Sequence, residues 1–195
     1  MNRLDATRIL AAAAGEAPIV ASLGHPAYDL FAAGDRPANF YTWGSMGVAS
    51  SIGLGLAIGR PDLRVFVADG DGSLLMNLGS LATIGWTAPP NLVVLVWDNA
   101  EYATTGGQPT ATSAAADLAA AAAALGIAGS VTVRDEAALR QALARAQAEP
   151  GPWLINVKVA ESAPRAKPPL DCVFIKQRFM AAIGSPEAAT IGGPA

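Results

Sequence analysis

The sequence predicts an α/β protein with three layers, in which helices cover both faces of a central, mostly parallel sheet. Two runs, 63–68 and 92–97, are nearly continuous in apolar residues, as strands buried on both faces should be. Short strand-like runs alternate with helix-like segments along the chain, which is the pattern of parallel α/β folds. No internal repeat divides the sequence, so both observations point to a single sheet.

Turn residues divide the first third of the chain into short elements. Glycine and proline mark most boundaries, and the segment before Arg60-Pro61-Asp62 is apolar and rich in small residues. In chain order we expect a helix at 4–14, a strand at 18–23, a turn at 24–26, a helical turn at 27–33, a weak strand at 39–43, a turn at 44–47 and a helix at 48–59.

The remaining residues continue the alternation of strands and helices. Pro89-Pro90 should stop a helix that opens after Gly72, and Asp135 suits a helix N-cap. We expect a strand at 63–68, one helix at 73–86, a strand at 92–97, a polar loop at 102–112, a helix at 114–125 that starts at Asp117 or Ser113, a strand at 129–133, a helix at 135–148, a strand at 153–159, a connector at 161–169 and a helix at 171–183.

The composition suits one compact domain. Of the 195 residues, 52% are hydrophobic and only 15% are charged, so the chain can bury a core. We expect one domain at 1–184 and a frayed tail at 185–195. The net charge is −3 and the basic residues are scattered, which argues against a nucleic-acid surface or a polybasic membrane patch.

A single cysteine, Cys172, excludes an internal disulfide framework and fits a cytoplasmic location. It lies in an apolar helical stretch with no histidine nearby, so we expect it in the core. The apolar run 9–14 is too short to span a membrane, and the polar Gly15-Glu16 that follows argues against a signal peptide.

Two polar turns follow the two most apolar strands. Gly70-Asp71-Gly72-Ser73 follows the first, and Asp98-Asn99 follows the second, with Asp71 and Asn99 28 positions apart. If the strands are parallel neighbours, both turns lie at the edge where α/β sheets place ligands. Backbone N–H groups and the Ser73 hydroxyl could hold phosphate there, and Asp71 and Asn99 could share one Mg²⁺.

Three other features have a structural and a functional interpretation. The glycines at 53, 55 and 59 lie inside an apolar helix rather than at a strand-to-helix turn, so we interpret them as packing residues and not as a dinucleotide fingerprint. The turn at 44–47 could simply bury Met46. His25, the only histidine, follows a strand at the expected ligand edge, where it is either structural or in contact with ligand.

These residues resemble the thiamine diphosphate enzymes. The resemblance rests on Gly70-Asp71-Gly72-Ser73, just under thirty further residues and then an Asp-Asn pair, with support from the stretches 44–55, 105–110 and 174–179. It runs from about residue 18 to 183 and implies the diphosphate-binding domain of the thiamine diphosphate-binding fold. Within the family the chain looks closest to beta subunits of sulfopyruvate decarboxylase, and next to phosphonopyruvate decarboxylases.

The resemblance implies a role for each site residue. Asp71, the Asn99 side chain and the Glu101 carbonyl would bind Mg²⁺, the Gly44 carbonyl would accept a hydrogen bond from the cofactor's amino group, and Met46 would bend the cofactor. The full set of implied cofactor contacts is His25, Gly44, Ser45, Met46, Gly70, Asp71, Gly72, Ser73, Asn99, Glu101 and Tyr102.

Two departures from the family pattern affect this interpretation. Asp98 stands where many members have Asn, which should not remove the metal site because the second residue of the pair is the ligand. His25 stands where members often have a small hydroxyl residue, so its role is open.

The resemblance also implies a partner. In the family a glutamate from a pyrimidine-binding domain activates the cofactor, and about 195 residues make one such domain rather than two. We therefore expect a hetero-oligomer in which an alpha-type subunit supplies that glutamate. The expected function is decarboxylation of a 2-oxo acid, with sulfopyruvate as the first candidate.

Two alternatives remain open. One is half of another split thiamine diphosphate enzyme, such as a phosphonopyruvate decarboxylase, an oxidoreductase or a synthase. The other is a non-catalytic assembly subunit that keeps the fold. The segment 101–112 contains no Arg or Lys. We therefore expect the residues that bind the substrate's second acid group to come from the partner.

Overall fold

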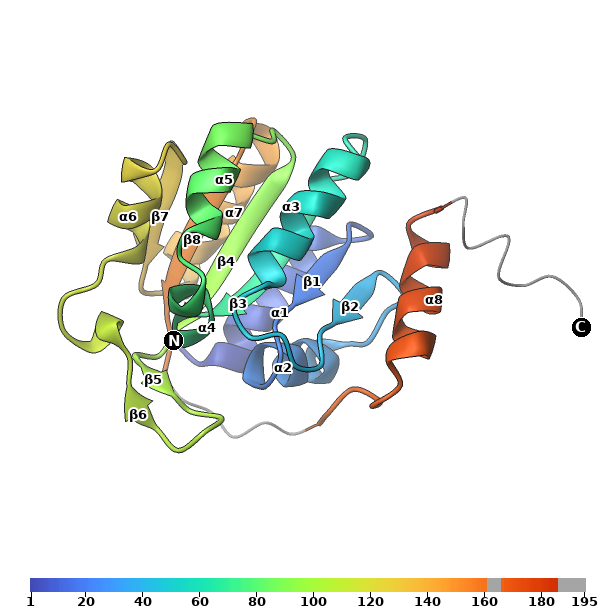
Figure 1. Cartoon of the computed structure of the whole chain (residues 1–195), viewed down its shortest axis with the longest axis horizontal. Helices are drawn as coiled ribbons and strands as arrows, with labels where there is room; N and C mark the ends of the chain where they lie inside the picture. Colours follow the sequence, from blue (N-terminus) through green and yellow to red (C-terminus); the bar gives the residue numbers. More distant parts are fainter. Residues whose placement is uncertain (161–165, 186–195) are drawn as a thin grey trace, which may run out of the picture.

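The computed structural model describes residues 1–160 and 166–185 of the chain. Its main sheet has six strands in the order β2-β1-β3-β4-β8-β7, and every pairing in it is parallel (Figure 1). The strands are β1 (Ile19–Ala21), β2 (Asn39–Tyr41), β3 (Val65–Gly70), β4 (Leu92–Asp98), β7 (Gly129–Val133) and β8 (Trp153–Lys158). The predicted parallel sheet is confirmed.

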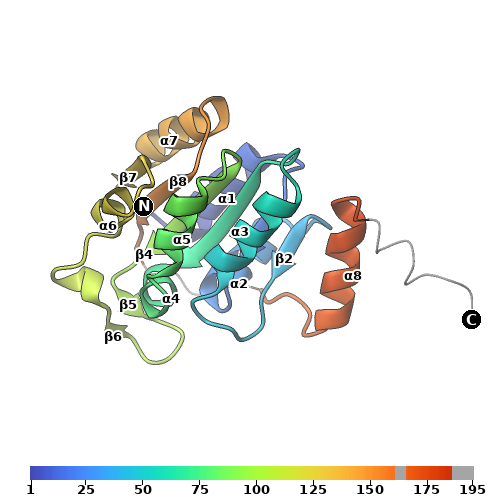
Figure 2. The same cartoon turned by 45° about the horizontal axis from the view of Figure 1, so that its top comes forward.

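Helices cover both faces of the sheet, and a separate hydrophobic cluster fills each interface (Figure 2). One face carries α1 (Arg3–Ala14), α2 (His25–Ala33) and α7 (Glu136–Ala148); the other carries α3 (Ala49–Gly59), α4 (Asp71–Met76), α5 (Ser80–Thr87) and α6 (Leu118–Ala124). The last helix, α8 (Cys172–Ala182), lies beside the edge strand β2. The predicted three-layer α/β/α architecture is confirmed.

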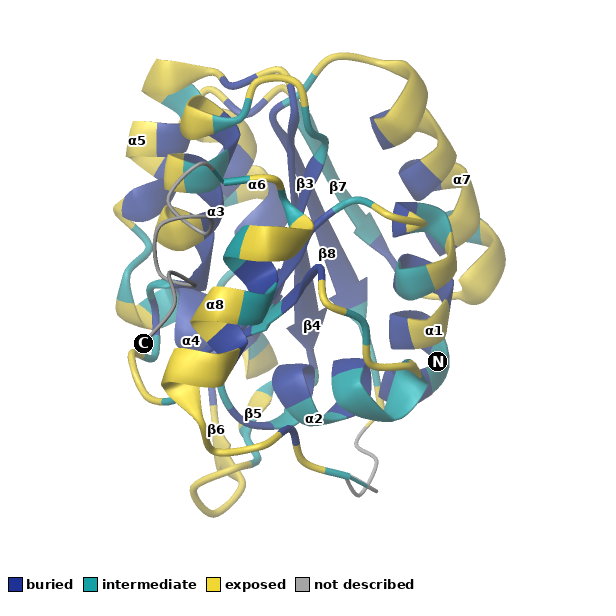
Figure 3. Ribbon diagram, turned by 90° about the vertical axis from the view of Figure 1, so that its right-hand side faces the viewer, coloured by how far each residue is buried: buried dark blue, intermediate teal, exposed yellow. Residues whose placement is uncertain are grey.

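The central strands are buried along their length. Every residue of β4 is buried, as are all residues of β3 except Gly70, which is partly exposed. In Figure 3 these strands are dark blue between helices whose outer faces are yellow. In α3, a Cβ on Gly53 would lie 2.2 Å from the Val67 side chain. Close packing of α3 on β3 therefore explains Gly53. The same interpretation is wrong for Gly55 and Gly59, where an added Cβ would meet nothing within 4 Å.

Two predicted boundaries are wrong near the carboxyl edge. The expected turn at 24–26 is shorter, because His25 and Pro26 already belong to α2; a proline fits the first turn of a helix, where its missing N–H needs no partner. The expected helix at 73–86 is two helices. Asn77 ends α4, and its side chain donates a hydrogen bond of 3.0 Å to the Gly47 carbonyl.

The expected polar loop at 102–112 is more ordered than predicted. It contains an antiparallel ribbon of β5 (Glu101–Tyr102) and β6 (Gln108–Pro109), followed by the 3-10 turn η1 (Ala111–Ser113). Gly106 and Gly107 both have positive φ, which lets the ribbon reverse direction. The next helix, expected at 114–125, spans Leu118–Ala124. Of its two expected starting residues, Asp117 is confirmed as the N-cap, since its side chain accepts from the Ala120 N–H.

The C-terminal part holds one further correction. Cys172 is exposed instead of buried, because α8 packs on the protein through Ile175 and Phe179 and leaves Cys172 on its outer side. Phe179 meets Phe40 of β2 with ring centroids 5.2 Å apart. Residues 161–165 of the expected connector at 161–169 and residues 186–195 of the expected tail at 185–195 lie outside the described residues. Among the described helices, none has the length and apolar character needed to cross a bilayer.

Candidate functional site

The two polar turns lie side by side at the carboxyl edge of the sheet. β3 and β4 are parallel neighbours in register, with Gly70 opposite Trp97, so the residues after each strand meet at one place. A pocket opens there between the strand ends, α2 and the β5–β6 ribbon. Its lining residues are Arg3, Leu23, His25, Pro26, Met46, Gly70, Asp71, Gly72, Ser73, Asn99, Glu101, Tyr102, Ala103, Thr104 and Thr105.

The pocket brings together most of the residues expected at a site. Of the residues implied as cofactor contacts, only Gly44 and Ser45 do not line it; both are exposed in the loop that leads to Met46. Met46 itself is partly buried and faces the pocket, as does His25, whose ring lies 6.2 Å from that of Tyr28. The structure thus brings together expected site residues from four separate segments, which are His25, Met46, 70–73 and 99–102.

Asp71 opens α4, and its carboxylate is buried, with 2% of the residue exposed. The hydroxyls of Thr110 and Thr112 lie 2.6 Å and 3.0 Å from one carboxylate oxygen, Oδ2. Burial raises the pKa of Asp71 above its usual value, these two hydrogen bonds lower it in part, and the charge of Asp98 adds to the rise. No salt bridge reaches Asp71 within the described residues, so a cation from outside the chain would stabilise its charge.

The turn after β4 offers further oxygen atoms. The Asn99 side-chain oxygen accepts from the Glu101 N–H at 3.3 Å, and Ala100 between them has a φ of 63°. Asn99 and Glu101 both line the pocket that Asp71 faces. Within residues 1–160 and 166–185, no group of three His, Cys, Asp or Glu could hold a metal.

The implied ligands, one carboxylate, one amide oxygen and one backbone carbonyl, are hard oxygen donors, and they fill only three of the six positions around a Mg²⁺ ion. Mg²⁺ prefers such oxygen donors, and it commonly completes its six ligands with phosphate oxygens and water. The donor chemistry at Asp71, Asn99 and Glu101 therefore fits a Mg²⁺ ion held jointly with a diphosphate, and it does not fit a metal enclosed entirely by protein.

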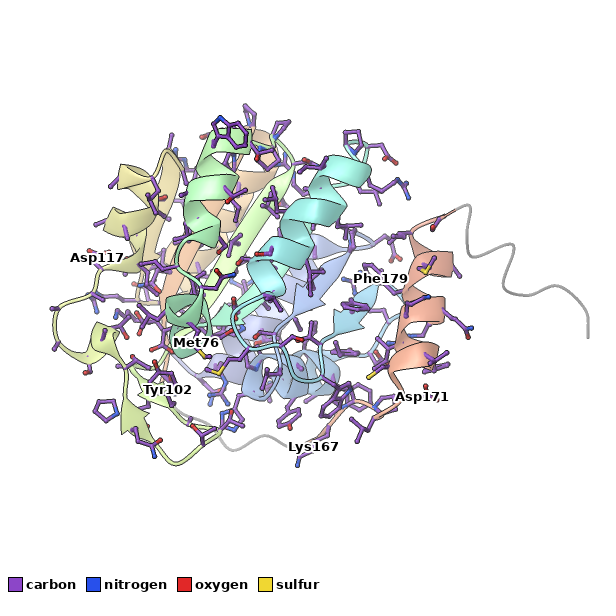
Figure 4. The ribbon with its side chains drawn as sticks, in the orientation of Figure 1. Met76, Tyr102, Asp117, Lys167, Asp171 and Phe179 are labelled. Atoms are coloured by element: carbon purple, nitrogen blue, oxygen red, sulfur yellow. The ribbon has the colours of Figure 1, made fainter. Side chains whose placement is uncertain are left out.

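The glycines of the first turn have different surroundings. A Cβ on Gly70 would meet nothing within 4 Å, so the backbone there is open to the pocket. A Cβ on Gly72 would lie 2.4 Å from the Tyr102 ring, which covers the start of α4 (Figure 4). On the opposite wall, a Cβ on Gly24 would lie 2.7 Å from the Thr104 hydroxyl. Two of these glycines therefore allow the β5–β6 ribbon to close over the site.

Ser73 is bonded differently from the sequence-based expectation. Its hydroxyl accepts from the Gly47 N–H at 3.0 Å and lies 3.1 Å from the Ser22 hydroxyl, so it ties the Met46 loop to α4. Asp69 lies behind this contact and is fully buried, which raises the pKa of its carboxyl group. The expected contact of Ser73 with a diphosphate would therefore come from its backbone N–H.

Sequence reasoning missed several residues of this site. Thr110 lies in a stretch that was already singled out, but Thr112 carried no signal of its own. Arg3, from the N-terminal helix, also lines the pocket, where its Nε donates to Asp29 at 2.6 Å in a buried salt bridge. The chain thus supplies a guanidinium to the pocket wall from a segment remote in sequence.

Comparison with known proteins gives consistent matches. The family model for the thiamine pyrophosphate enzyme, C-terminal TPP binding domain, matches residues 26–157. The chain is 42% identical over 186 residues to the sulfopyruvate decarboxylase subunit beta of Methanococcus maripaludis, a match that covers 94% of this chain and 98% of that protein.

Two further matches are to longer proteins. The chain is 40% identical over 185 residues to the phosphonopyruvate decarboxylase of Streptomyces viridochromogenes, covering 94% of this chain and 46% of that protein. This chain therefore spans about half the length of that relative. The crystal structure of benzoylformate decarboxylase from Polynucleobacter necessarius matches with a TM-score of 0.65 and 18% identity, over 87% of this chain and 34% of that chain. At that identity the likeness concerns the fold alone.

Proposed function

The chain belongs to the thiamine pyrophosphate enzymes, through their C-terminal TPP-binding domain, and from that premise we propose that it is the diphosphate-binding subunit of a 2-oxo-acid decarboxylase. One observation carries the proposal: a buried carboxylate without a salt bridge, Asp71, faces the same pocket as Asn99 and Glu101. These oxygens suit a Mg²⁺ ion that bridges to the cofactor's diphosphate.

Each part of the pocket has one task in this proposal. Asp71, Asn99 and the Glu101 carbonyl hold the metal, and the backbone N–H groups of Gly72 and Ser73 hold the diphosphate. Thiamine diphosphate, when bound, would supply a thiazolium ring that takes up the electrons released as CO₂ leaves a 2-oxo acid.

The Met46 loop would position the middle of the cofactor. In this proposal the Gly44 carbonyl would accept a hydrogen bond from the cofactor's amino group. Met46, partly buried at the pocket wall, would contact the cofactor there and hold it in the bent shape that the family resemblance implies. His25 lies close enough to the pocket to contact the diphosphate or the substrate.

Sulfopyruvate is the proposed substrate, and sulfoacetaldehyde and CO₂ are the proposed products. The support is the name of the Methanococcus maripaludis relative, with which this chain aligns over nearly the whole of both sequences. Phosphonopyruvate is the second candidate, supported by the Streptomyces viridochromogenes relative at a similar identity. Both substrates carry a second acid group, so both require a cationic or N–H donor in addition to those that hold the diphosphate.

A partner chain completes the site in this proposal. It is a pyrimidine-binding, alpha-type subunit that supplies the activating glutamate, and the two chains form a hetero-oligomer in the cytoplasm. The support is that the relative of matching length is named a subunit, whereas the phosphonopyruvate decarboxylase has more than twice the aligned length in one chain. The isolated chain is then expected to bind little cofactor and to have no decarboxylase activity.

The test is co-expression of this chain with a candidate pyrimidine-binding, alpha-type subunit. The purified complex would be assayed for CO₂ release from sulfopyruvate, phosphonopyruvate and pyruvate, with and without Mg²⁺ and thiamine diphosphate. We expect the highest kcat/KM for sulfopyruvate. A complex that binds the cofactor but decarboxylates none of the three favours another split enzyme, and one that binds no cofactor favours an assembly subunit. Turnover by the isolated chain would refute the requirement for a partner.

A further inference from the structure

We propose that Lys158 is a positioning residue of the metal site, which acts through Asp98 and the Thr112 hydroxyl to orient the Asp71 carboxylate. The inference rests on the proposed function in one respect, that Asp71 is a Mg²⁺ ligand. It assigns a task to Asp98, the residue at which the sequence departs from the Asn that many family members carry.

Lys158 and Asp98 are paired by the sheet itself. They are the last residues of β8 and β4, and they lie opposite each other in the parallel register. The Lys158 Nζ is 2.5 Å from Asp98 Oδ2, and the Asn156 side chain donates to the same oxygen at 3.0 Å. The Asp98 side chain is 0% exposed and that of Lys158 is 26% exposed, so solvent screens this ion pair only in part.

The other oxygen of Asp98 faces the site. Asp98 Oδ1 lies 2.8 Å from the Thr112 hydroxyl and accepts from the Ala100 N–H at 3.2 Å. Thr112 also lies 3.0 Å from Asp71 Oδ2. One hydroxyl group thus bridges two buried carboxylates, of which one has a lysine partner and the other faces the pocket.

The number of hydrogen atoms makes this bridge directional. A threonine hydroxyl has one hydrogen to donate. Thr110 donates to Asp71 Oδ2 at 2.6 Å. The single Thr112 hydrogen is then shared among three acceptors, which are Asp98 Oδ1 at 2.8 Å, the Thr110 hydroxyl at 2.8 Å and Asp71 Oδ2 at 3.0 Å. Lys158 and Asn156 already donate to Asp98, which weakens its demand for that hydrogen. The Lys158 and Asn156 contacts thus shift the sharing of the Thr112 hydrogen away from Asp98 and toward Asp71.

Removal of the lysine charge should reverse this preference. In a Lys158→Met chain, Asp98 loses its cationic hydrogen-bond donor and competes more strongly for the Thr112 hydrogen. Asp71 then retains one hydroxyl donor in place of two and is held less firmly in the orientation that faces the pocket. Loss of a group that orients a metal ligand typically weakens metal binding about 10- to 100-fold.

The first measurement is calorimetric titration of Mg²⁺ into the complex of this chain with its pyrimidine-binding subunit, at saturating thiamine diphosphate. We expect Lys158→Met and Thr112→Val each to weaken Mg²⁺ binding about 10-fold. Because both act through the same hydroxyl, the double variant should lose no more than about twofold beyond either single variant. Fully additive losses would overturn the proposal, since they would mean that Lys158 acts independently of Thr112.

A second double variant separates positioning from general damage to the fold. Asp98→Asn with Lys158→Met removes both charges and keeps an oxygen that can accept from Ala100. The Thr112 hydrogen should again go to Asp71, so Mg²⁺ affinity should return to within about twofold of the original chain. If this double variant binds Mg²⁺ as weakly as Lys158→Met alone, the proposed linkage is wrong. Arg140→Met, which breaks an exposed pair with Glu136, is the matched control and should change nothing.

A readout without cofactor keeps this inference separate from the proposed function. If the original complex binds no Mg²⁺ and no thiamine diphosphate, the proposed function fails, and a crystal structure of the Lys158→Met chain still decides the linkage. We expect the Thr112 hydroxyl to move away from Asp71 and the Asp71 side chain to change its rotamer. An unchanged Asp71–Thr112 contact in that structure would overturn the proposal.

Discussion

The two ends of the pocket are held in place by different means. At the carboxylate end, Asp71 and Asp98 are each only 2% exposed and are fixed by side-chain hydrogen bonds and a salt bridge. At the other end, Gly44 and Ser45 are exposed, and both have positive φ. The chain fixes this second loop at Gly47, where Ser73 and Asn77 hold the backbone N–H and C=O.

This contrast separates the part of the pocket that the chain orders by itself from the part that is left exposed. The carboxylate end is already ordered by groups within the chain, so binding a metal there requires little rearrangement. The Met46 loop is exposed at Gly44 and Ser45, so in the proposed complex the partner subunit would cover it. Substitutions at the two ends should therefore affect different steps: binding at the carboxylate end, and turnover at the loop.

The largest effect on binding is expected from Asp71→Ala. It removes the one carboxylate of the proposed donor set, so thiamine diphosphate should no longer bind in a Mg²⁺-dependent way. The loss should exceed the ~10- to 100-fold that follows removal of a group behind a metal ligand. Calorimetric titration of the subunit complex with the cofactor, with and without Mg²⁺, measures it.

Asp62→Ala is the control for this substitution, because Asp62 is an exposed carboxylate paired with Arg60 just after the C-terminal end of α3. It should leave cofactor affinity unchanged. Equal cofactor affinities for the Asp71→Ala complex and the original complex would show that Asp71 does not bind the metal. The carboxylate end of the pocket would then not be the end that governs binding.

Much of the carboxylate end was predictable from sequence for a physical reason. Continuous apolar runs identify buried parallel strands, and parallel neighbours necessarily bring the residues after them to one edge. Asp71 and Asn99 follow directly from that rule. Thr110 and Thr112 do not, because their contacts with Asp71 span 39 and 41 positions and depend on how the β5–β6 ribbon folds back.

The Met46 loop was harder to predict for the same reason. The break between α4 and α5 depends on Asn77, whose side chain bonds Gly47 from 30 positions away. The local signal for that break is weak, because Asn77, Gly79 and Ser80 disfavour a helix interior but the segment from 73 to 86 has no proline. Cys172 was misplaced because an apolar stretch alone does not reveal which side of a helix meets the protein.

A smaller loss of binding is expected from Gly72→Ala. The new Cβ would lie 2.4 Å from the Tyr102 ring and 3.2 Å from the Thr110 side chain, so Tyr102 must move. Such overpacking typically costs about 1–3 kcal/mol. Because Thr110 holds Asp71, we expect part of that cost to appear as weaker Mg²⁺ and cofactor binding in the same titration.

A double-variant cycle with Tyr102→Ala tests this explanation. Without the ring, the alanine at position 72 has space, so the second substitution should cost less in the Tyr102→Ala background than in the original chain. Equal costs in the two backgrounds would mean that the glycine is needed for a backbone conformation or a ligand contact, and not for the aromatic cover.

The smallest effect on binding, with a clear effect on turnover, is expected from Met46→Ala. The side chain lies at the pocket wall and offers no charge or hydrogen bond to a diphosphate, so affinity should change by less than about threefold. If Met46 shapes the bound cofactor, its loss misplaces the reacting atoms, and misplacement on the order of 1 Å can slow turnover about 100-fold.

Met76→Ala is the matched control, because Met76 is 62% exposed on the neighbouring α4 and does not line the pocket. We expect kcat of the complex to fall at least about 10-fold for Met46→Ala and to stay unchanged for Met76→Ala. Equal kcat values for the two variants would make Met46 a packing residue, and the loop would then differ from the carboxylate end in exposure but not in function.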